Sequence, residues 1–406
     1  MKERIILHID TNNAFLSWTA TEMLKNGSKV DIRNKYAIIG GNEKERRGIV
    51  LAKSNLCKQK GVVTAETIYN ARKKCPYLEV YPPNYNIYIK YSNMMYNYLL
   101  QYTDIIERYS IDECFLDYTD SKILFGDPIK IAYKIKDDIK NQFGFTVNVG
   151  IGNNKLCAKM ASDFSKPDKV HTLFNYEVKE KMWPLPIEDL FMVGKSSAKK
   201  LKELNINTIK DLAQADEKLL YKYFKNRTTQ MINSANGIDN SKVEYEYEDP
   251  KSISNSTSLA YNYKIKEDIQ KVIKELSTQT GDKLRKNKLY ASNVNIWIKY
   301  KDFTKISKQE KLPNPINSDI DIYNIAIKLF NKIWNEESIR AICVGVSDLS
   351  KNNNIQLNLF NTPKIIKEHK KENENLQKTI DTLNKKYNNI ITYANKIKNK
   401  KEDNNE

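Results

Sequence analysis

Residues 109–119 read YSIDECFLDYT, a run of aromatic and branched side chains that is interrupted by Asp112 and Glu113. This composition is typical of a buried β-strand, where unpaired carboxylates are costly. Successive residues of a straight strand point to opposite faces, so both acids can serve one site only if the strand turns or bulges. An exposed hairpin tip with two solvated acids is the ordinary alternative.

A third acid, Asp10, ends another apolar run, RIILHID, at residues 4–10. This run predicts a second strand of the same sheet, with Asp10 emerging at the sheet edge. Three carboxylates that converge there would form a hard-oxygen site suited to Mg²⁺. Two such ions, about 3.5 to 4 Å apart, would activate an attacking oxygen and stabilise a leaving oxygen at phosphorus.

Phosphate chemistry also needs cations, and Lys58 and Lys159 lie on predicted helices of the same part of the chain. As isolated lysines, both would ordinarily be solvated surface residues. Gly150 and Gly152 would let a backbone pass close to a substrate, although they form no dinucleotide-binding fingerprint. The stretch VGKSS at 193–197 is like the end of a P-loop, but residue 189 is not the glycine that this loop requires.

The composition indicates a large, basic protein with about three domains. Its 67 Lys and Arg against 50 Asp and Glu give a net charge of +17, so nucleic acid is the leading kind of partner. The alternative is that the organism's proteins are generally basic, which would give the same excess of positive charge without a nucleic-acid partner. The 5 cysteines form no CxxC pair, which favours a reducing, cytoplasmic compartment over disulfides or zinc. No apolar stretch approaches the roughly 20 residues that span a membrane.

Apolar periodicity predicts strands alternating with helices up to about residue 165, which describes one α/β unit with an insertion after its first strand. A helical region follows, then a polar segment with the character of a linker, then a second α/β unit. The elements predicted most clearly are helices at 14–24, 87–102, 127–144, 154–167 and 323–335, and strands at 36–41, 145–152, 293–301 and 340–349.

Four stretches carry a resemblance to a known family. HIDTNNAFLS, GIVLAKSNLCKQKG, YSIDECFLDYT and VGIGNNKLCAKMASDFSKP occur in the order and at about the intervals of the Y-family DNA polymerases, and they most resemble the DNA polymerase IV group. The similarity covers essentially residues 4–360 and implies a multidomain α/β (α+β) fold of the right-hand polymerase type. The implied domains are a palm at 1–165 with small fingers inserted at about 16–77, a helical thumb at 166–237, a linker at 238–250, a little finger at 251–350, and a clamp-binding peptide with a helical tail at 351–406.

The resemblance also implies roles for individual residues. Asp10, Asp112 and Glu113 would bind two Mg²⁺ ions with the backbone carbonyl of Thr11, and Glu113 would help to activate the primer 3′-hydroxyl. Phe15 would be the steric gate that excludes a 2′-hydroxyl and so favours deoxynucleotides.

Three further positions, Asn55, Lys58 and Lys159, would contact the incoming triphosphate. Two of them depart from the family pattern, because Asn55 replaces a frequent tyrosine and Lys58 replaces an arginine, which exchanges a bidentate fork for a point charge. Ala14 stands where the family usually has a second aromatic residue. These departures concern nucleotide affinity more than the type of reaction.

The thumb segment LFMVGKSSAKKLKELNI resembles a helix-hairpin-helix, in which the backbone near Gly194 and Lys195 would contact a DNA phosphate. Met192 replaces the usual first glycine of its turn, and a plain helical hairpin is the alternative. QLNLF resembles the sliding-clamp-binding peptide, with Gln356 as hydrogen-bonding residue and Leu357, Leu359 and Phe360 as apolar anchors. A coiled-coil-like seam from Leu376 to Ile397 follows, which could dock on the protein, self-associate or remain unfolded alone.

We therefore expect a low-fidelity, template-directed DNA polymerase for translesion synthesis and DNA repair, a nucleotidyltransferase without proofreading. Its partners would be primer-template DNA, deoxynucleoside triphosphates and the sliding clamp. We expect a monomer in the cytoplasm, associated with the nucleoid and not with a membrane. A catalytically impaired Y-family-like DNA-binding protein recruited to the clamp is the main alternative, because of Ala14 and Asn55. A nucleotide cyclase is a weaker one, because it would not need a thumb, little finger or clamp peptide.

Overall fold

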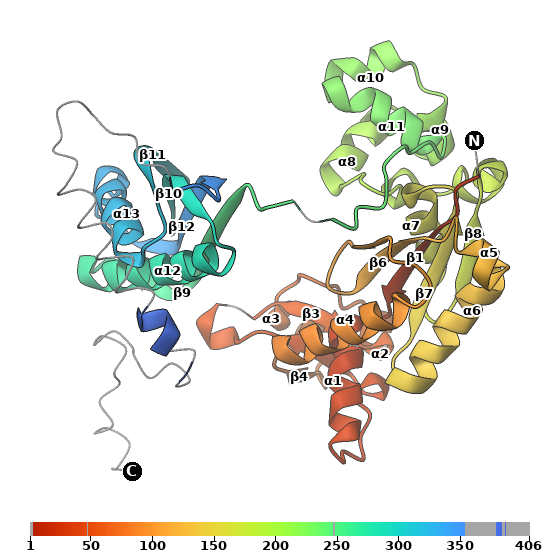
Figure 1. Cartoon of the computed structure of the whole chain (residues 1–406), viewed down its shortest axis with the longest axis horizontal. Coiled ribbons are helices and arrows are strands. Elements are labelled where there is room, and N and C mark those ends of the chain that lie inside the picture. The colour runs from red at the N-terminus through yellow and green to blue at the C-terminus, as the bar shows by residue number, and fades with distance from the viewer. Residues whose placement is uncertain (1–2, 47, 247, 354–378, 384–385, 387–406) are drawn as a thin grey trace. The chain divides into compact units, whose positions relative to one another are not determined.

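The structure is a computed structural model that describes residues 3–46, 48–246, 248–353, 379–383 and 386. It divides into two compact units (Figure 1), which are Met1–Asn42 with Gly48–Tyr247 and Glu43–Arg47 with Glu248–Glu406. The division falls inside the predicted linker at 238–250. Among the described residues, none of the helices combines the length and the apolar character needed to cross a bilayer.

A five-stranded sheet forms the centre of the first unit, in the order β5-β6-β1-β7-β8. β1 is the middle strand and pairs antiparallel with β6 and β7, while β8 pairs parallel with β7. β8 belongs to this sheet and lies beyond residue 165, where the predicted palm ends. The strands are β1 (Ile6–Thr11), β5 (Ile106–Arg108), β6 (Glu113–Asp117), β7 (Val147–Gly152) and β8 (Val170–Leu173).

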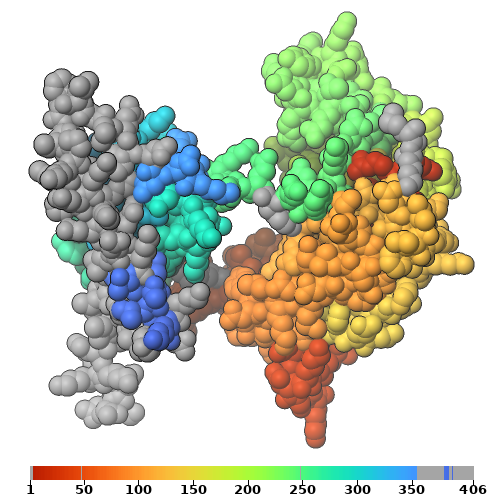
Figure 2. Space-filling model, viewed as in Figure 1, coloured from red at the N-terminus to blue at the C-terminus, as the bar shows by residue number. Residues whose placement is uncertain are grey.

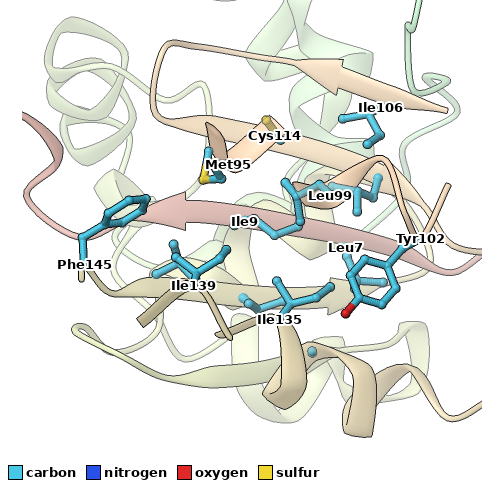
Figure 3. Packing of buried hydrophobic residues seen from close by; sticks show 14 of the residues in the cluster. Leu7, Ile9, Met95, Leu99, Tyr102, Ile106, Cys114, Ile135, Ile139 and Phe145 are labelled. Atoms are coloured by element: carbon cyan, nitrogen blue, oxygen red, sulfur yellow. The ribbon is translucent and has the colours of Figure 1, made fainter. Parts of the chain in front are cut away.

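One face of this sheet is covered by α4 (Tyr85–Leu99) and α6 (Pro128–Asp138). Figure 3 shows Leu7 and Ile9 of β1 gathered there with Leu99 and Ile135 of the two helices. This helical layer, orange to yellow in Figure 2, forms a continuous outer surface. The predicted helix at 87–102 is confirmed, and its most deeply buried side chains are Tyr88, Tyr91, Met95 and Leu99. Ile87, Met94 and Tyr98 are only partly buried.

The opposite face of the sheet packs against α7 (Lys155–Asp163). Two glycines of β7 make this contact possible, because a Cβ on Gly150 would lie 2.0 Å from the Ala158 carbonyl oxygen and one on Gly152 would lie 2.7 Å from the Ala158 nitrogen. These glycines were expected to let a substrate approach, and this expectation is wrong. They let α7 approach the sheet.

The insertion after β1 contains a small sheet in the order β3-β2-β4. Its last strand lies beyond residue 77, so the insertion is longer than predicted. Ser54 and Thr67 begin helices α2 and α3 as N-caps, each accepting a backbone N–H. The elements are α1 (Ala14–Lys25), β2 (Ala37–Gly40), β3 (Val50–Lys53), α2 (Asn55–Gln59), α3 (Ile68–Lys74) and β4 (Glu79–Tyr81).

A helical region completes the first unit and shares a core with α7. The chain that follows it remains attached to the sheet, since Asn154 donates to the Gly237 carbonyl at 2.8 Å and the Glu244 N–H donates to Glu107 at 2.8 Å. Val243 is buried. The first half of the predicted linker is therefore held in place. The helices are α8 (Lys195–Glu203), α9 (Ile209–Ala213), α10 (Glu217–Phe224) and α11 (Thr228–Ala235), and the short α5 (Lys122–Phe125) lies between β6 and α6.

The second unit is a four-stranded antiparallel sheet, in the order β11-β10-β12-β9, with two helices packed on one face. The predicted strands at 293–301 and 340–349 and the helix at 323–335 are confirmed, whereas β9, α12 and β11 were not predicted. The predicted clamp peptide 356–360 lies outside the described residues, as does most of the tail seam. The elements are β9 (Ser252–Tyr263), α12 (Lys266–Lys286), β10 (Tyr290–Tyr300), β11 (Lys305–Ile316), α13 (Asp319–Ile333) and β12 (Ile339–Ser350).

Candidate active site

The alternation of β1 places His8 and Asp10 on the face of the sheet that α7 covers, opposite to Leu7 and Ile9. Asp10 pairs with Glu113 in the register of β1 and β6. Cross-strand neighbours of this kind bring their Cβ atoms to about 5 Å. The strand order thus joins two acids that are far apart in sequence.

The hairpin between β5 and β6 explains how two adjacent acids serve one site. β6 begins only at Glu113, and Asp112 lies in the bend before it. Thr11 donates its backbone N–H to the Asp112 carbonyl at 3.0 Å, and Ser110 donates its hydroxyl to the Asp112 carboxylate at 2.6 Å. The predicted turn at the two acids is therefore present, and both side chains are partly buried rather than solvated at a tip.

Two lysine ammonium groups stand among the three carboxylates. Lys159 Nζ lies 2.8 Å from Glu113 Oε1 and 3.7 Å from Asp10 Oδ2. Lys166 Nζ contacts Asp10 and lies 2.8 Å from Asp163. Burial alone would lower the pKa of each lysine, but the neighbouring carboxylates outweigh it and raise both pKa values.

The carboxylates differ in their pKa shifts. Burial raises the pKa of Asp112, and the nearby charges of Asp10 and Glu113 raise it further. Burial would also raise the pKa of Glu113, but His8 and Lys159 reverse this and lower it to about 2. Burial lowers the pKa of His8 itself.

A divalent metal fits the chemistry of this donor set. Within the described ranges, no three acidic, histidine or cysteine side chains close around a single point. Ammonium groups bridge the acids instead, which indicates a concentration of negative charge that requires cations. Three carboxylates and the carbonyl of a strand end are hard oxygen ligands of the kind that Mg²⁺ prefers.

A pocket of about 320 Å³ opens beside the acids. Phe15 forms part of its wall, with its ring stacked on Tyr88 at a centroid distance of 4.2 Å and an interplanar angle of 3°. Residues of the insertion after β1 line the same pocket. Seven of the predicted site residues line it, namely Asp10, Thr11, Phe15, Asn55, Lys58, Asp112 and Glu113, and Ala14 lies beside them.

Five polar residues of the pocket were missed from the sequence, namely Asn12, Asn13, Lys53, Thr64 and Lys166. Lys53 donates to the Thr64 hydroxyl at 3.0 Å, and burial together with Lys58 lowers the Lys53 pKa. The predicted Lys159 does not line the pocket, because it is buried beneath the acids. No spacing in the sequence pointed to Lys166, which follows α7 in an irregular segment.

The predicted thumb contact lies apart from the pocket. Gly194 is the N-cap of α8 and, like Lys195, is exposed. Met192 has a φ of 71° and a side chain that is 65% exposed, so a non-glycine residue occupies the left-handed conformation in this turn.

A sheet that presents carboxylates at one edge, beside a pocket that the insertion also lines, is the arrangement expected of a polymerase of the right-hand class. Three family descriptions match the chain: the impB/mucB/samB family over residues 9–163, the IMS family HHH motif over 177–206, and the impB/mucB/samB family C-terminal domain over 250–359. The chain belongs to this family, the Y-family of DNA polymerases, and within it to the DNA polymerase IV group.

Two similar proteins illustrate this membership. DNA polymerase IV of Clostridium acetobutylicum is 46% identical over 385 residues, which cover 95% of this chain and 96% of that protein. DNA polymerase IV 1 of Bacillus subtilis is 35% identical over 392 residues, which cover 95% and 91%. Among solved structures, a Y-family DNA polymerase chimera matches with a TM-score of 0.75 over 86% of this chain and all of the other, at 24% identity. The similarity to this chimera shows that the two chains share a fold.

Proposed function

We propose that the chain copies template DNA with low fidelity and extends primers past damaged bases, as a DNA-directed DNA polymerase that depends on a divalent metal. The observation that carries this proposal is the set of three acids, Asp10, Asp112 and Glu113, which line one pocket together with the Phe15 ring. Retention of this set argues against the catalytically impaired alternative.

The metal sites that we propose use the carboxylates of Asp10, Asp112 and Glu113 and the backbone carbonyl of Thr11. Mg²⁺, two ions per site, would lower the pKa of an attacking hydroxyl and stabilise the leaving pyrophosphate. The protein's contribution is to hold four oxygen donors on two paired strands and one bend. Glu113 would also position the primer 3′-hydroxyl.

The incoming deoxynucleoside triphosphate would occupy the pocket. The stacked Phe15 ring would lie against its sugar, and the exposed ammonium of Lys58 and the amide of Asn55 would face its phosphates. Lys166 joins them in our proposal, since its side chain is a third exposed and lines the pocket. Lys159 remains a candidate for the triphosphate, but it would first have to leave Glu113.

The DNA and protein partners follow from the rest of the chain. We propose that the net charge of +17 serves primer-template DNA, with backbone contacts near Gly194 and Lys195. Residues 356–360 would bind the sliding clamp. We further propose that the protein is a monomer that works on the nucleoid in the cytoplasm. For the domains, we propose the roles and boundaries that the sequence predicts, except that the palm extends to include β8.

Primer extension on an undamaged and an abasic template tests the proposal. Asp112→Asn and Glu113→Gln keep the size of each side chain but remove its charge, so each should lower kcat by at least about a hundredfold while the protein still binds primer-template DNA. Asp104→Asn, which makes the same change at an exposed acid outside the pocket, is the matched control. A wild-type protein that adds no nucleotide, or an Asp112→Asn/Glu113→Gln protein that adds them normally, would overturn the assignment.

A further inference from the structure

His8 lies directly behind the acids and is fully buried. Its ring is tilted against Phe115, at a centroid distance of 4.5 Å. Nδ1 lies 2.8 Å from the Ser162 hydroxyl of α7, and Nε2 faces Oε2 of Glu113 at 3.7 Å. Within the described part of the chain, Nε2 has no hydrogen-bond partner. A buried polar atom without a partner is uncommon and calls for an explanation.

The contacts of the two ring nitrogens show what a hydrogen on each of them would meet. Glu113 is ion-paired with Lys159, so its carboxylate can only accept hydrogen bonds. A hydrogen on Nε2, the nitrogen that faces this carboxylate, would therefore give it a donor. The Ser162 hydroxyl can donate as well as accept, so it can serve Nδ1 as a donor. In the structure the same hydroxyl donates to the Lys159 carbonyl at 2.8 Å, so it would turn from this carbonyl to Nδ1 when Nε2 carries the hydrogen.

The two oxygens of Glu113 have different environments. Oε1 is bound by Lys159, on the side of the other acids, while Oε2 faces His8 on the buried side. The 3.7 Å between His8 Nε2 and Glu113 Oε2 is longer than a hydrogen bond. A movement of the Glu113 carboxylate by about 0.8 Å would bring the two atoms to the usual 2.9 Å. Such a shift becomes possible if Glu113 is released from Lys159 when a metal takes that place.

We propose that His8 is a positioning residue for Glu113, whose Nε2–H holds Oε2 on the buried side and leaves Oε1 free for a divalent cation. This inference rests on the proposed metal role of Glu113. Outer contacts that orient a ligating carboxylate typically change metal affinity or activity by about 10- to 100-fold when they are removed. A ring that served only as core filler would have no such effect once an apolar ring replaced it.

The test uses the full chain with a dideoxy-terminated primer, its template and the matching deoxynucleotide, and measures Mn²⁺ binding by electron paramagnetic resonance. His8→Phe keeps the ring against Phe115 but removes the N–H, and we expect Mn²⁺ binding about 10- to 100-fold weaker. His8→Gln offers an amide N–H to the same oxygen and should recover most of this loss. With an extendable primer, kcat should follow the same order while KM for the nucleotide stays close to the wild-type value.

Thermal unfolding identifies variants that are not folded. If His8→Phe is unfolded, Ser162→Ala replaces it, because loss of the hydroxyl that fixes Nδ1 should also weaken Mn²⁺ binding. Wild-type Mn²⁺ binding by folded His8→Phe, or a folded His8→Gln no better than His8→Phe, would overturn the inference alone. Wild-type protein that does not bind Mn²⁺ would overturn the metal site itself and the inference with it.

Discussion

Replacement of Phe15 by alanine should relax the choice between deoxyribonucleotides and ribonucleotides. The Phe15 ring stacks on Tyr88 at 4.2 Å, and Tyr85 meets the same ring edge-on at 6.2 Å. Tyr88 is fully buried, with its hydroxyl 3.3 Å from that of Thr19. Because the residues behind Phe15 are tightly packed, its ring cannot retreat to make room for a 2′-hydroxyl. The alanine variant removes the obstacle itself.

The expected change in sugar selectivity follows from the binding free energy that one small group contributes in a closely fitting pocket. An extra or missing group of this size changes binding in the transition state by about 1–3 kcal/mol, or about 10- to 200-fold. The ratio of kcat/KM for ribonucleotide to that for deoxynucleotide should rise by this factor in Phe15→Ala. A fully buried Phe→Ala change costs about 3–5 kcal/mol, so the partly buried Phe15 should lose about 2 kcal/mol and the variant should still fold.

Single-nucleotide incorporation of dCTP and CTP opposite template dG measures this ratio. Phe15→Leu, which retains much of the bulk, is the matched control and should fall between wild type and Phe15→Ala. Thermal unfolding shows whether each variant is folded. A folded Phe15→Ala protein whose ratio stays within about twofold of wild type would refute the steric-gate reasoning, because 1 kcal/mol corresponds to about fivefold.

Three other predictions concern the lysines, the thumb turn and the tail. Lys166→Met should raise KM for the deoxynucleotide by about 10- to 100-fold in a steady-state assay, because it removes a hydrogen bond from a charged group. A larger rise for Lys159→Met in the same assay would instead make Lys159 the main triphosphate contact. Met192→Gly should increase the free energy of unfolding by about 0.5–1 kcal/mol in chemical denaturation, because it relieves a left-handed conformation at 71°, whereas Met192→Ala should give no gain. Deleting residues 356–360 should abolish stimulation by the sliding clamp and leave distributive synthesis intact, and clamp binding that persists would contradict this role.

The sequence was sufficient to predict the elements that carry the acids. An apolar run that ends in Asp10 and an apolar run broken at Asp112 are local patterns, and both strands formed where they were expected. The requirement for a bend at Asp112 also came from a local rule, the alternation of side chains along a strand. The acids were therefore predictable because each depends on the few residues around it.

The residues that the sequence did not reveal depend on contacts between distant segments. His8 meets Ser162 and Glu113 only because β1 pairs with β6 while α7 packs across it. The role of Gly150 is similarly invisible until the helix above it is placed. β9 was missed for another reason, since its exposed serines and asparagines give no apolar alternation.

The two lysines explain how three acids can be gathered at one edge of the sheet. Three carboxylates at one sheet edge would repel one another, and the pKa of Asp112 is already raised by burial and by its two neighbours. Lys159 and Lys166 offset this repulsion as counter-ions, but they differ in freedom, because the side chain of Lys159 is 9% exposed and that of Lys166 is 33% exposed. A metal that takes over the charge of Asp10 would therefore release Lys166 into the pocket more readily than Lys159. In our proposal, the Lys166 ammonium would offset the repulsion among the acids and then face the triphosphate, which is why the KM of Lys166→Met separates the two lysines.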